Sequence, residues 1–199
     1  ATIQPHEQLM WHHDFNFTPM SSGVGVRRGN DFYVLDEIVL TSAVARQSAL
    51  EFVERFKNHQ NRNVIIYGDP AGRAGEKHGH ASDYTEMEGV LKSNGWNVQR
   101  KVKLAAPAIR DRQNAVRAKI CNAAGERSLF VNPSKAPYMH KGLSTVQIKK
   151  GSTFLEEDSE YQHITTAIGY CIDHEWPVRP ERTVADATPL PSVNHFNRN

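Results

Sequence analysis

The sequence predicts an α/β domain with a mixed central sheet. Its first forty residues hold three strand-like segments in close succession, as consecutive hairpins do. The rest alternates helical and strand-like periodicity, which is typical of strands joined by crossover helices. A length of 199 residues, with 39% hydrophobic and 23% charged residues, suits one soluble globular domain with a single sizeable core.

The three N-terminal strands are predicted over "LMWHHDFNF" (residues 9–17), "GVGVRRG" (23–29) and "DFYVLDEIVL" (31–40). All three are rich in β-branched and aromatic residues, and "RRGND" is a tight turn between the last two. We therefore expect three consecutive antiparallel strands.

A crossover helix is predicted over residues 41–59, because Thr and Ser open the segment as possible caps and apolar residues follow near helical spacing. The strand "NVIIYGD" (63–69) comes next, and its nearly continuous apolar run is typical of a strand covered on both faces. The further predicted elements are a helix near 83–93, a strand over 96–102, a helix near 109–124, a strand over 128–132, a hairpin over 145–157 and a helix over 159–176.

Pro177 ends the last helix, and residues 179–199 are rich in Pro, Asn and Arg without periodicity. We expect a domain over residues 1–178, followed by a C-terminal tail over 179–199 that is mobile or serves for docking. The chain begins without Met, in the polar "ATIQPHEQ". We expect a piece excised from a longer protein, with processing as the alternative.

Composition narrows the class of protein. No apolar run approaches the roughly 18 residues of a membrane span, and no signal peptide opens the chain, so we expect no membrane partner and a cytosolic protein. A net charge of +2 is too weak to indicate nucleic-acid binding by itself. Cys121 and Cys171 lack the CxxC spacing of a metal or redox site, and both are predicted to be buried thiols in helices.

Two aspartates, Asp14 and Asp69, lie in predicted strands of the central sheet. Asp14 lies in the first strand, within "HHDFN", and Asp69 closes the fourth strand at "IIYGDPAG". If these strands are neighbours, both side chains can point into one crevice, and like charges so close are tolerable with a divalent cation between them. Hard oxygen ligands suit Mg²⁺ or Mn²⁺ better than zinc.

Each aspartate also has a simpler interpretation. Asp69 precedes Pro70, and Asp before Pro commonly starts a turn, so its carboxylate can cap the following residues. The structural explanation is weaker for Asp14, because a charged residue near the centre of a hairpin strand needs a reason.

Five segments in order, "DFN", "YVLDEIVL", "IIYGDPAG", "IRDRQNAVRAKICNAAGERSLFVNP" and "HITTAIGYCIDHEWPV", resemble the C-terminal nuclease domain of the large terminase subunit of tailed bacteriophages. The resemblance covers roughly residues 9–178, and the order and spacing are more specific than any single motif. It implies an RNase H-like fold and a metal-dependent endonuclease that cuts concatemeric viral double-stranded DNA at initiation and termination of packaging. Two Mg²⁺ or Mn²⁺ ions serve the hydrolysis, with Asp14 and Asp69 as the first two metal-binding aspartates.

The resemblance also implies partners and a location. The domain is normally fused to, or associated with, the ATPase motor of the same subunit, and it acts with the portal protein and the small terminase subunit on double-stranded DNA. Its place is then the host cytoplasm, at the procapsid, and not among the structural components of the virion.

The third acidic ligand of the family departs from the pattern here. Family members usually read approximately "HxxDAxGY" at the start of the last helix, whereas this chain reads "HITTAIGY", with Thr166 at the aspartate position. Asp173 lies seven residues further on, on nearly the same helix face but roughly 10 Å along the axis. We expect Asp173 as the third metal-binding and catalytic acid, with a solvated residue near the helix end as the alternative. The other possible donors are His163, Glu157 and Asp158, a DNA phosphate, or a group from the rest of the parent protein.

Several basic residues are candidates for DNA contacts. The Gly-rich loop "GRAGEKHGH" supplies Arg73 and Lys77 directly after Asp69, and the hairpin tip supplies Lys149 and Lys150. A plain surface loop is the alternative, and the P-loop pattern fails because Glu76 follows Gly75. A basic strip is expected from residues 101–119, with a solvated face as the alternative. Its members are Lys101, Lys103, Arg110, Arg112, Arg117 and Lys119.

Two further sites involve Glu37 and a pair of histidines. Glu37 is a candidate supporting acid near the metal cluster, although a solvated carboxylate at an edge is simpler. His78 and His80 lack the further ligands of a zinc site.

Two classes of function stay open from the sequence. One is the endonuclease domain; the alternative is a non-catalytic RNase H-like module that has lost its third acidic ligand and only binds DNA, the portal or another assembly partner. A nucleotide-dependent transferase is disfavoured by the missing phosphate loop and the early hairpins.

Overall fold

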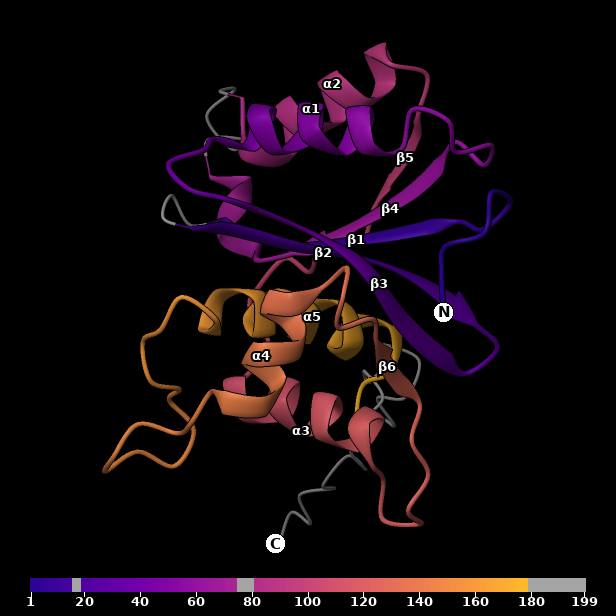
Figure 1. Cartoon of the computed structure of the whole chain (residues 1–199). Coiled ribbons are helices and arrows are strands. Elements are labelled where there is room, and N and C mark those ends of the chain that lie inside the picture. Colours follow the sequence, from indigo (N-terminus) through magenta and orange to yellow (C-terminus); the bar gives the residue numbers. More distant parts are fainter. Residues whose placement is uncertain (16–18, 75–80, 179–199) are drawn as a thin grey trace, which may run out of the picture.

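The fold is described from a computed structural model, which places residues 1–15, 19–74 and 81–178. A twisted sheet lies in the middle of the molecule, with helices α1 and α2 on one face and α3, α4 and α5 on the other (Figure 1). The C-terminal tail predicted over 179–199 lies outside the described residues.

The sheet has the strand order β5-β4-β1-β2-β3-β6. β1, β2 and β3 pair antiparallel, as predicted, while β4 runs parallel to β1, β5 parallel to β4 and β6 parallel to β3. The mixed central sheet predicted from the sequence is therefore confirmed. The strands are β1 (Leu9–Asp14), β2 (Met20–Arg28), β3 (Asp31–Leu40), β4 (Asn63–Gly68), β5 (Asn97–Arg100) and β6 (Leu129–Val131).

Five helices and a short 3₁₀ turn complete the described parts of the chain. They are α1 (Ala45–Arg55), η1 (Pro70–Arg73), α2 (Asp83–Ser93), α3 (Ile109–Ile120), α4 (Pro137–Thr145) and α5 (Gln162–Glu175). The periodicity of the sequence does not predict α4, which is nine residues long and carries Pro and Gly. Gly142 lets α4 approach α5, since a Cβ there would lie 2.7 Å from Cγ2 of Thr165.

Two hydrophobic cores lie on opposite faces of the sheet. Under α1 and α2, Trp11 of β1 stacks on Phe52 of α1 with ring centroids 4.3 Å apart. Under α3, α4 and α5, Met10 of β1 and Tyr67 of β4 pack with the apolar face of α5. Because side chains alternate along a strand, every second residue of β1 and β4 faces α5.

Two local predictions need correction or refinement. Cys171 is buried in α5 as predicted, but Cys121 is exposed, because α3 ends at Ile120 and the backbone of Cys121 is already extended. The predicted hairpin over 145–157 is reduced to one bridge between Ile148 and Glu156. No helix within the described ranges is both long enough and apolar enough to cross a bilayer.

Candidate functional site

Asp14 and Asp69 end two neighbouring parallel strands. The register of β1 and β4 pairs His13 with Gly68, so the two aspartates are the next residues along the two strands. By alternation, Asp14 shares a face with Met10, and Asp69 follows Tyr67 on that same face. Both carboxylates therefore belong to the α5 side of the sheet.

The residues before Asp14 add no charge to the site. Burial lowers the pKa of His12 to about 3, and it lowers the pKa of His13 well below its usual value. Both imidazoles are neutral at pH 7, and the ring of His13 packs between Trp11 and Phe15. Asp14 is thus the one acidic side chain that β1 brings to this end of the sheet.

Asp69 is held firmly by its local backbone. Its Oδ1 accepts the N–H of Ala71 at 2.8 Å and caps η1, so the interpretation of Asp69 as a turn cap is correct. The hydroxyl of Tyr84 donates to the Asp69 carbonyl at 2.8 Å, and Gly68 leaves room for that hydroxyl. A carboxylate has about four lone-pair sites, so the cap leaves acceptors for another partner.

Asp14 faces the first turn of α5. Its side chain is 9% exposed, and its Oδ2 lies 3.2 Å from Nδ1 of His163. The hydrogen bond to Asp14 raises the pKa of His163, burial opposes that change, and the charges of Asp14 and Asp158 reinforce it. His163 was a secondary candidate from the sequence, and it is the α5 residue that the fold places on Asp14.

One face of α5 spans both aspartates. His163, Thr166 and Tyr170 are separated by three and four residues, so they share that face. Burial raises the pKa of Tyr170, the charge of Arg112 opposes that rise, and the nearby carboxylates of Asp69 and Asp14 add to it. Thr166 lies between these two residues along the helix, and its Oγ1 accepts a hydrogen bond from Gln162 at 2.8 Å.

Asp173 has a different partner. It is 4% exposed, and its Oδ2 forms an ion pair at 2.9 Å with Lys103, which follows β5. Asp173, which the sequence predicts as the third metal ligand, is thus paired with a lysine in the structure. The role of Asp173 in metal binding stays a prediction.

The predicted DNA-contacting residues are spread over two regions. Arg73 lies in η1 directly after Asp69, while Lys77, like His78 and His80, falls outside the described residues. Lys149 and Lys150 are exposed at the hairpin tip. Their contact with DNA stays a prediction.

The basic strip predicted over 101–119 is not a continuous solvated surface. Lys101 pairs with Glu175, Lys103 with Asp173, and the amine of Lys119 lies 3.9 Å from the ring centroid of Trp176. Several of these cations therefore contact other parts of the fold. Sequence periodicity cannot predict such contacts between distant segments.

Glu37 has a structural role at the start of α4, and its role as a supporting acid of this site stays a prediction. Its two carboxylate oxygens accept the N–H groups of Tyr138 and Met139 at 2.8 and 2.9 Å, so it caps the start of α4. Desolvation raises the pKa of Glu37, and the two backbone hydrogen bonds oppose that rise.

A hollow of about 410 Å³ opens beside His163. Its lining includes Tyr138, Asp158 and Glu160, so acidic groups approach the Asp14 side of the site. Such a lining favours a cation over a phosphate group.

Asp14 and Asp69 suit the binding of one divalent cation. They are hard oxygen donors on one face of adjacent strands, and each retains acceptor capacity. Over residues 1–15, 19–74 and 81–178, however, no group of three or more His, Cys, Asp or Glu side chains is arranged to hold a metal. The described residues therefore offer a carboxylate pair with an adjacent imidazole, and no ready third carboxylate.

Comparison with solved structures identifies the fold. The large terminase of a thermophilic bacteriophage matches with a TM-score of 0.55 and 13% identity, over 86% of this chain and 41% of that one. The nuclease domain of the P22 large terminase matches with a TM-score of 0.56 and 11% identity, over 85% and 82% of the two chains. The chain has the fold of a large terminase nuclease domain.

The Mn-bound nuclease domain of the g2p large terminase from bacteriophage SPP1 has the same fold, with a TM-score of 0.51 and 15% identity over 84% of this chain and 86% of that one. The terminase-like RNase H fold predicted from the sequence is thus confirmed. This chain spans about two fifths of the thermophilic phage protein. No family model and no curated protein matches the chain.

Proposed function

We propose that this chain is a divalent-metal-dependent DNA endonuclease domain that acts in viral genome packaging. The observation that carries the proposal is the placement of Asp14 and Asp69 at the ends of adjacent parallel strands, on the face covered by α5. The terminase nuclease fold supports the reaction class, and the Mn-bound SPP1 domain supports a divalent ion.

The residues present assign roles within this site. Asp14 and Asp69 would hold the ion, Mg²⁺ or Mn²⁺. His163 would orient Asp14 or, as a neutral imidazole, coordinate the ion through a ring nitrogen. A bound divalent ion supplies Lewis-acid polarisation of a phosphodiester and lowers the pKa of a bound water. Ala71 and Tyr84 keep Asp69 in place during the reaction.

We propose His163 ahead of Asp173 as the third protein group of the site. His163 contacts Asp14, whereas Asp173 is paired with Lys103. A second ion, as expected from the family resemblance, would need a further ligand such as a DNA phosphate, Asp158 or a group outside the described residues.

The proposed biological setting rests on the family resemblance of the sequence. The substrate would be concatemeric double-stranded viral DNA, with an ATPase motor domain as the fused or associated partner and with the portal and small terminase subunits in the same assembly. The site of action would be the packaging motor in the host cytoplasm. Arg73, Lys149 and Lys150 remain the proposed DNA contacts.

A DNA- or portal-binding module without catalysis is the second candidate. It is favoured by Thr166 at the position of the third aspartate and by the lack of a three-residue metal cluster within the described ranges. This candidate predicts retention of DNA without cleavage.

The deciding experiment is nicking of supercoiled plasmid in Mn²⁺ by the wild-type chain and by Asp14→Ala, Asp69→Ala, His163→Gln and Asp173→Asn. We expect nicking by the wild type and its loss in the first two variants. His163→Gln should weaken it, while Asp173→Asn should retain it and lower the melting temperature through loss of the Lys103 ion pair.

Three results would contradict parts of the proposal. Metal-independent DNA retention without cleavage by the folded wild type would support the binding module. Nicking that survives Asp14→Ala and Asp69→Ala would place the chemistry elsewhere or in a contaminant. Nicking lost in Asp173→Asn at an unchanged fold, and kept in His163→Gln, would restore Asp173 as the third ligand.

A further inference from the structure

Arg112 of α3 is a buried cation. Its side chain is 7% exposed, and its guanidinium carbon lies 4.6 Å from the ring centroid of Tyr170. Among the described residues, no carboxylate forms an ion pair with it. Burying a guanidinium has a desolvation cost, so this arrangement calls for a role beyond packing.

The backbone of α5 is adapted to the path of Arg112. A Cβ at Gly169 would lie 2.7 Å from Cγ and 2.8 Å from Cδ of Arg112. Because Gly169 has no side chain, the arginine stem crosses α5 in direct contact and the guanidinium reaches the Tyr170 ring.

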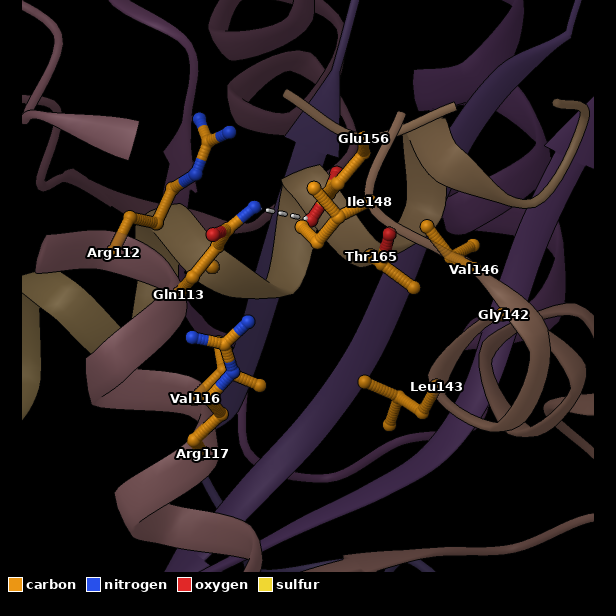
Figure 2. Close-up of a pocket in the computed structure, with 11 residues that line it drawn as sticks. Arg112, Gln113, Val116, Arg117, Gly142, Leu143, Val146, Ile148, Glu156 and Thr165 are labelled. Atoms are coloured by element: carbon orange, nitrogen blue, oxygen red, sulfur yellow. Dashed lines mark hydrogen bonds between the residues drawn. The ribbon is translucent and has the colours of Figure 1, made fainter. Parts of the chain in front are cut away.

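Neighbouring side chains of α3 take a different course. Figure 2 shows Arg112 and Gln113 leaving α3 in different directions, with Gln113 hydrogen-bonded to Glu156 at the wall of a cavity of about 150 Å³. Gln113 thus connects α3 to the hairpin, and Arg112 connects α3 to the face of α5 that carries Tyr170.

Tyr170 connects Arg112 to the candidate site, because it shares the face of α5 that carries His163, and the Asp69 carboxylate lies near enough to raise the pKa of its hydroxyl. Cation–π contact restrains the ring, and a restrained ring restrains the direction of its hydroxyl. Partners of a metal-binding carboxylate typically affect metal affinity by about 10- to 100-fold.

We propose that Arg112 is a positioning residue, which acts through the Tyr170 ring to orient the Asp69 carboxylate. This inference rests on the proposed function, since it assigns Asp69 to the metal site. Arg112 would touch neither the ion nor the reacting atoms, and its effect on the site would depend on the hydroxyl of Tyr170.

The test uses the full chain and the variants Arg112→Lys, Tyr170→Phe and their combination. Lys keeps the charge and loses the planar group that stacks on the ring, and Phe keeps the ring and loses the hydroxyl. Mn²⁺ affinity is measured by calorimetry. In the same samples, the amide signal of Ala71, which donates to Asp69, is followed by NMR without metal.

We expect Arg112→Lys to weaken Mn²⁺ binding by about threefold to tenfold and Tyr170→Phe by about tenfold. The combined variant should resemble Tyr170→Phe, because Arg112 acts through the hydroxyl that Phe lacks. Both single changes should shift the Ala71 amide signal. Arg110→Lys is the matched control, since Arg110 lies on the same helix, is exposed and stacks on Phe154.

Additive effects of the two changes, or an Ala71 signal that moves no more than in Arg110→Lys, would overturn the proposal. A lower melting temperature with unchanged Mn²⁺ affinity and Ala71 signal would show a packing role only and would overturn it as well. If the wild type binds no Mn²⁺, the proposed function fails, and the metal-free Ala71 signal still decides whether Arg112 orients Asp69.

Discussion

Helix α5 contacts the Asp14 carboxylate at its first turn and carries the Glu175 carboxylate at its last turn, and the charges around these two groups differ. At the last turn, Glu175 receives the Tyr67 hydroxyl at 2.9 Å, pairs with Lys101 at 2.8 Å and contacts Arg27 at 3.5 Å. At the first turn, Asp14 is in contact with His163. One end has two cations around one acid, and the other has two acids at the ends of neighbouring strands.

The difference separates a structural carboxylate from a candidate functional one. Hydrogen bonds from His174, Lys101 and Tyr67 lower the pKa of Glu175 to about 2, so its charge is stabilised by the fold itself. The hydrogen bonds that hold Asp14 and Asp69 come instead from an imidazole and a backbone N–H. A pair of this kind is stabilised by binding a cation, whereas Glu175 has no such need.

The largest expected effect tests this contrast directly. Asp14→Asn and Asp69→Asn should each reduce Mn²⁺-dependent nicking about a thousandfold, because a neutral amide is a poor ligand for a divalent ion. Glu175→Gln should retain nicking within about threefold when assayed well below its melting temperature. A Glu175→Gln protein that is folded and inactive would break the comparison.

Stability should show the opposite order. Glu175→Gln should lower the free energy of unfolding at pH 7 by about 2 kcal/mol, since its partners lose a buried counter-charge. Because the folded-state pKa of Glu175 lies below its ordinary value of 4.5, its contribution is present above pH 4.5 and is lost as pH falls towards about 2.

Urea denaturation from pH 7 to pH 2 measures this contribution, and the deficit of Glu175→Gln should shrink over the acidic part of the range. Glu54→Gln is the matched control, because Glu54 is 69% exposed and its pair with Lys57 is a surface contact. Equal decreases in the free energy of unfolding of the two variants would contradict the structural role assigned to Glu175.

Adding a third carboxylate next to Asp14 and Asp69 tests whether this end of α5 binds a cation. Thr166→Asp places an acid on α5 between His163 and Tyr170, so it should raise Mn²⁺ affinity about tenfold while lowering stability without metal. Calorimetric titration with Mn²⁺ checks the result. Thr165→Asp adds the same charge one residue away, on the side facing α4, and should leave the affinity unchanged.

The smallest expected effect concerns Glu37, a carboxylate stabilised by backbone donors. Glu37→Gln should lower the free energy of unfolding by about 1 kcal/mol, because one amide oxygen replaces two oxygens that accept the Tyr138 and Met139 N–H groups. Chemical denaturation at pH 7 measures it. Plasmid nicking should be unchanged. Loss of nicking in a folded Glu37→Gln protein would instead indicate that Glu37 supports the active site.

Much of the sheet could be predicted because its information is local. Strand alternation in "LMWHHD" and the apolar run of "NVIIYG" reflect which residues face a core, and that pattern survives in any tertiary arrangement. Helix α4 escaped prediction because its start depends on Glu37, about a hundred residues away. Its short length and its glycine also obscure the helical period.

The sequence by itself placed Asp14 within the first strand and Asp69 at the end of the fourth, because side-chain alternation and the Asp-Pro turn act over a few neighbouring residues. Only the tertiary structure decided that His163 meets Asp14, that Tyr170 reaches Asp69 and that Asp173 pairs with Lys103. These contacts depend on the position of α5 along the sheet and on its rotation about the helix axis. Close approaches at Gly142 and Gly169 set that position, and no local pattern encodes it.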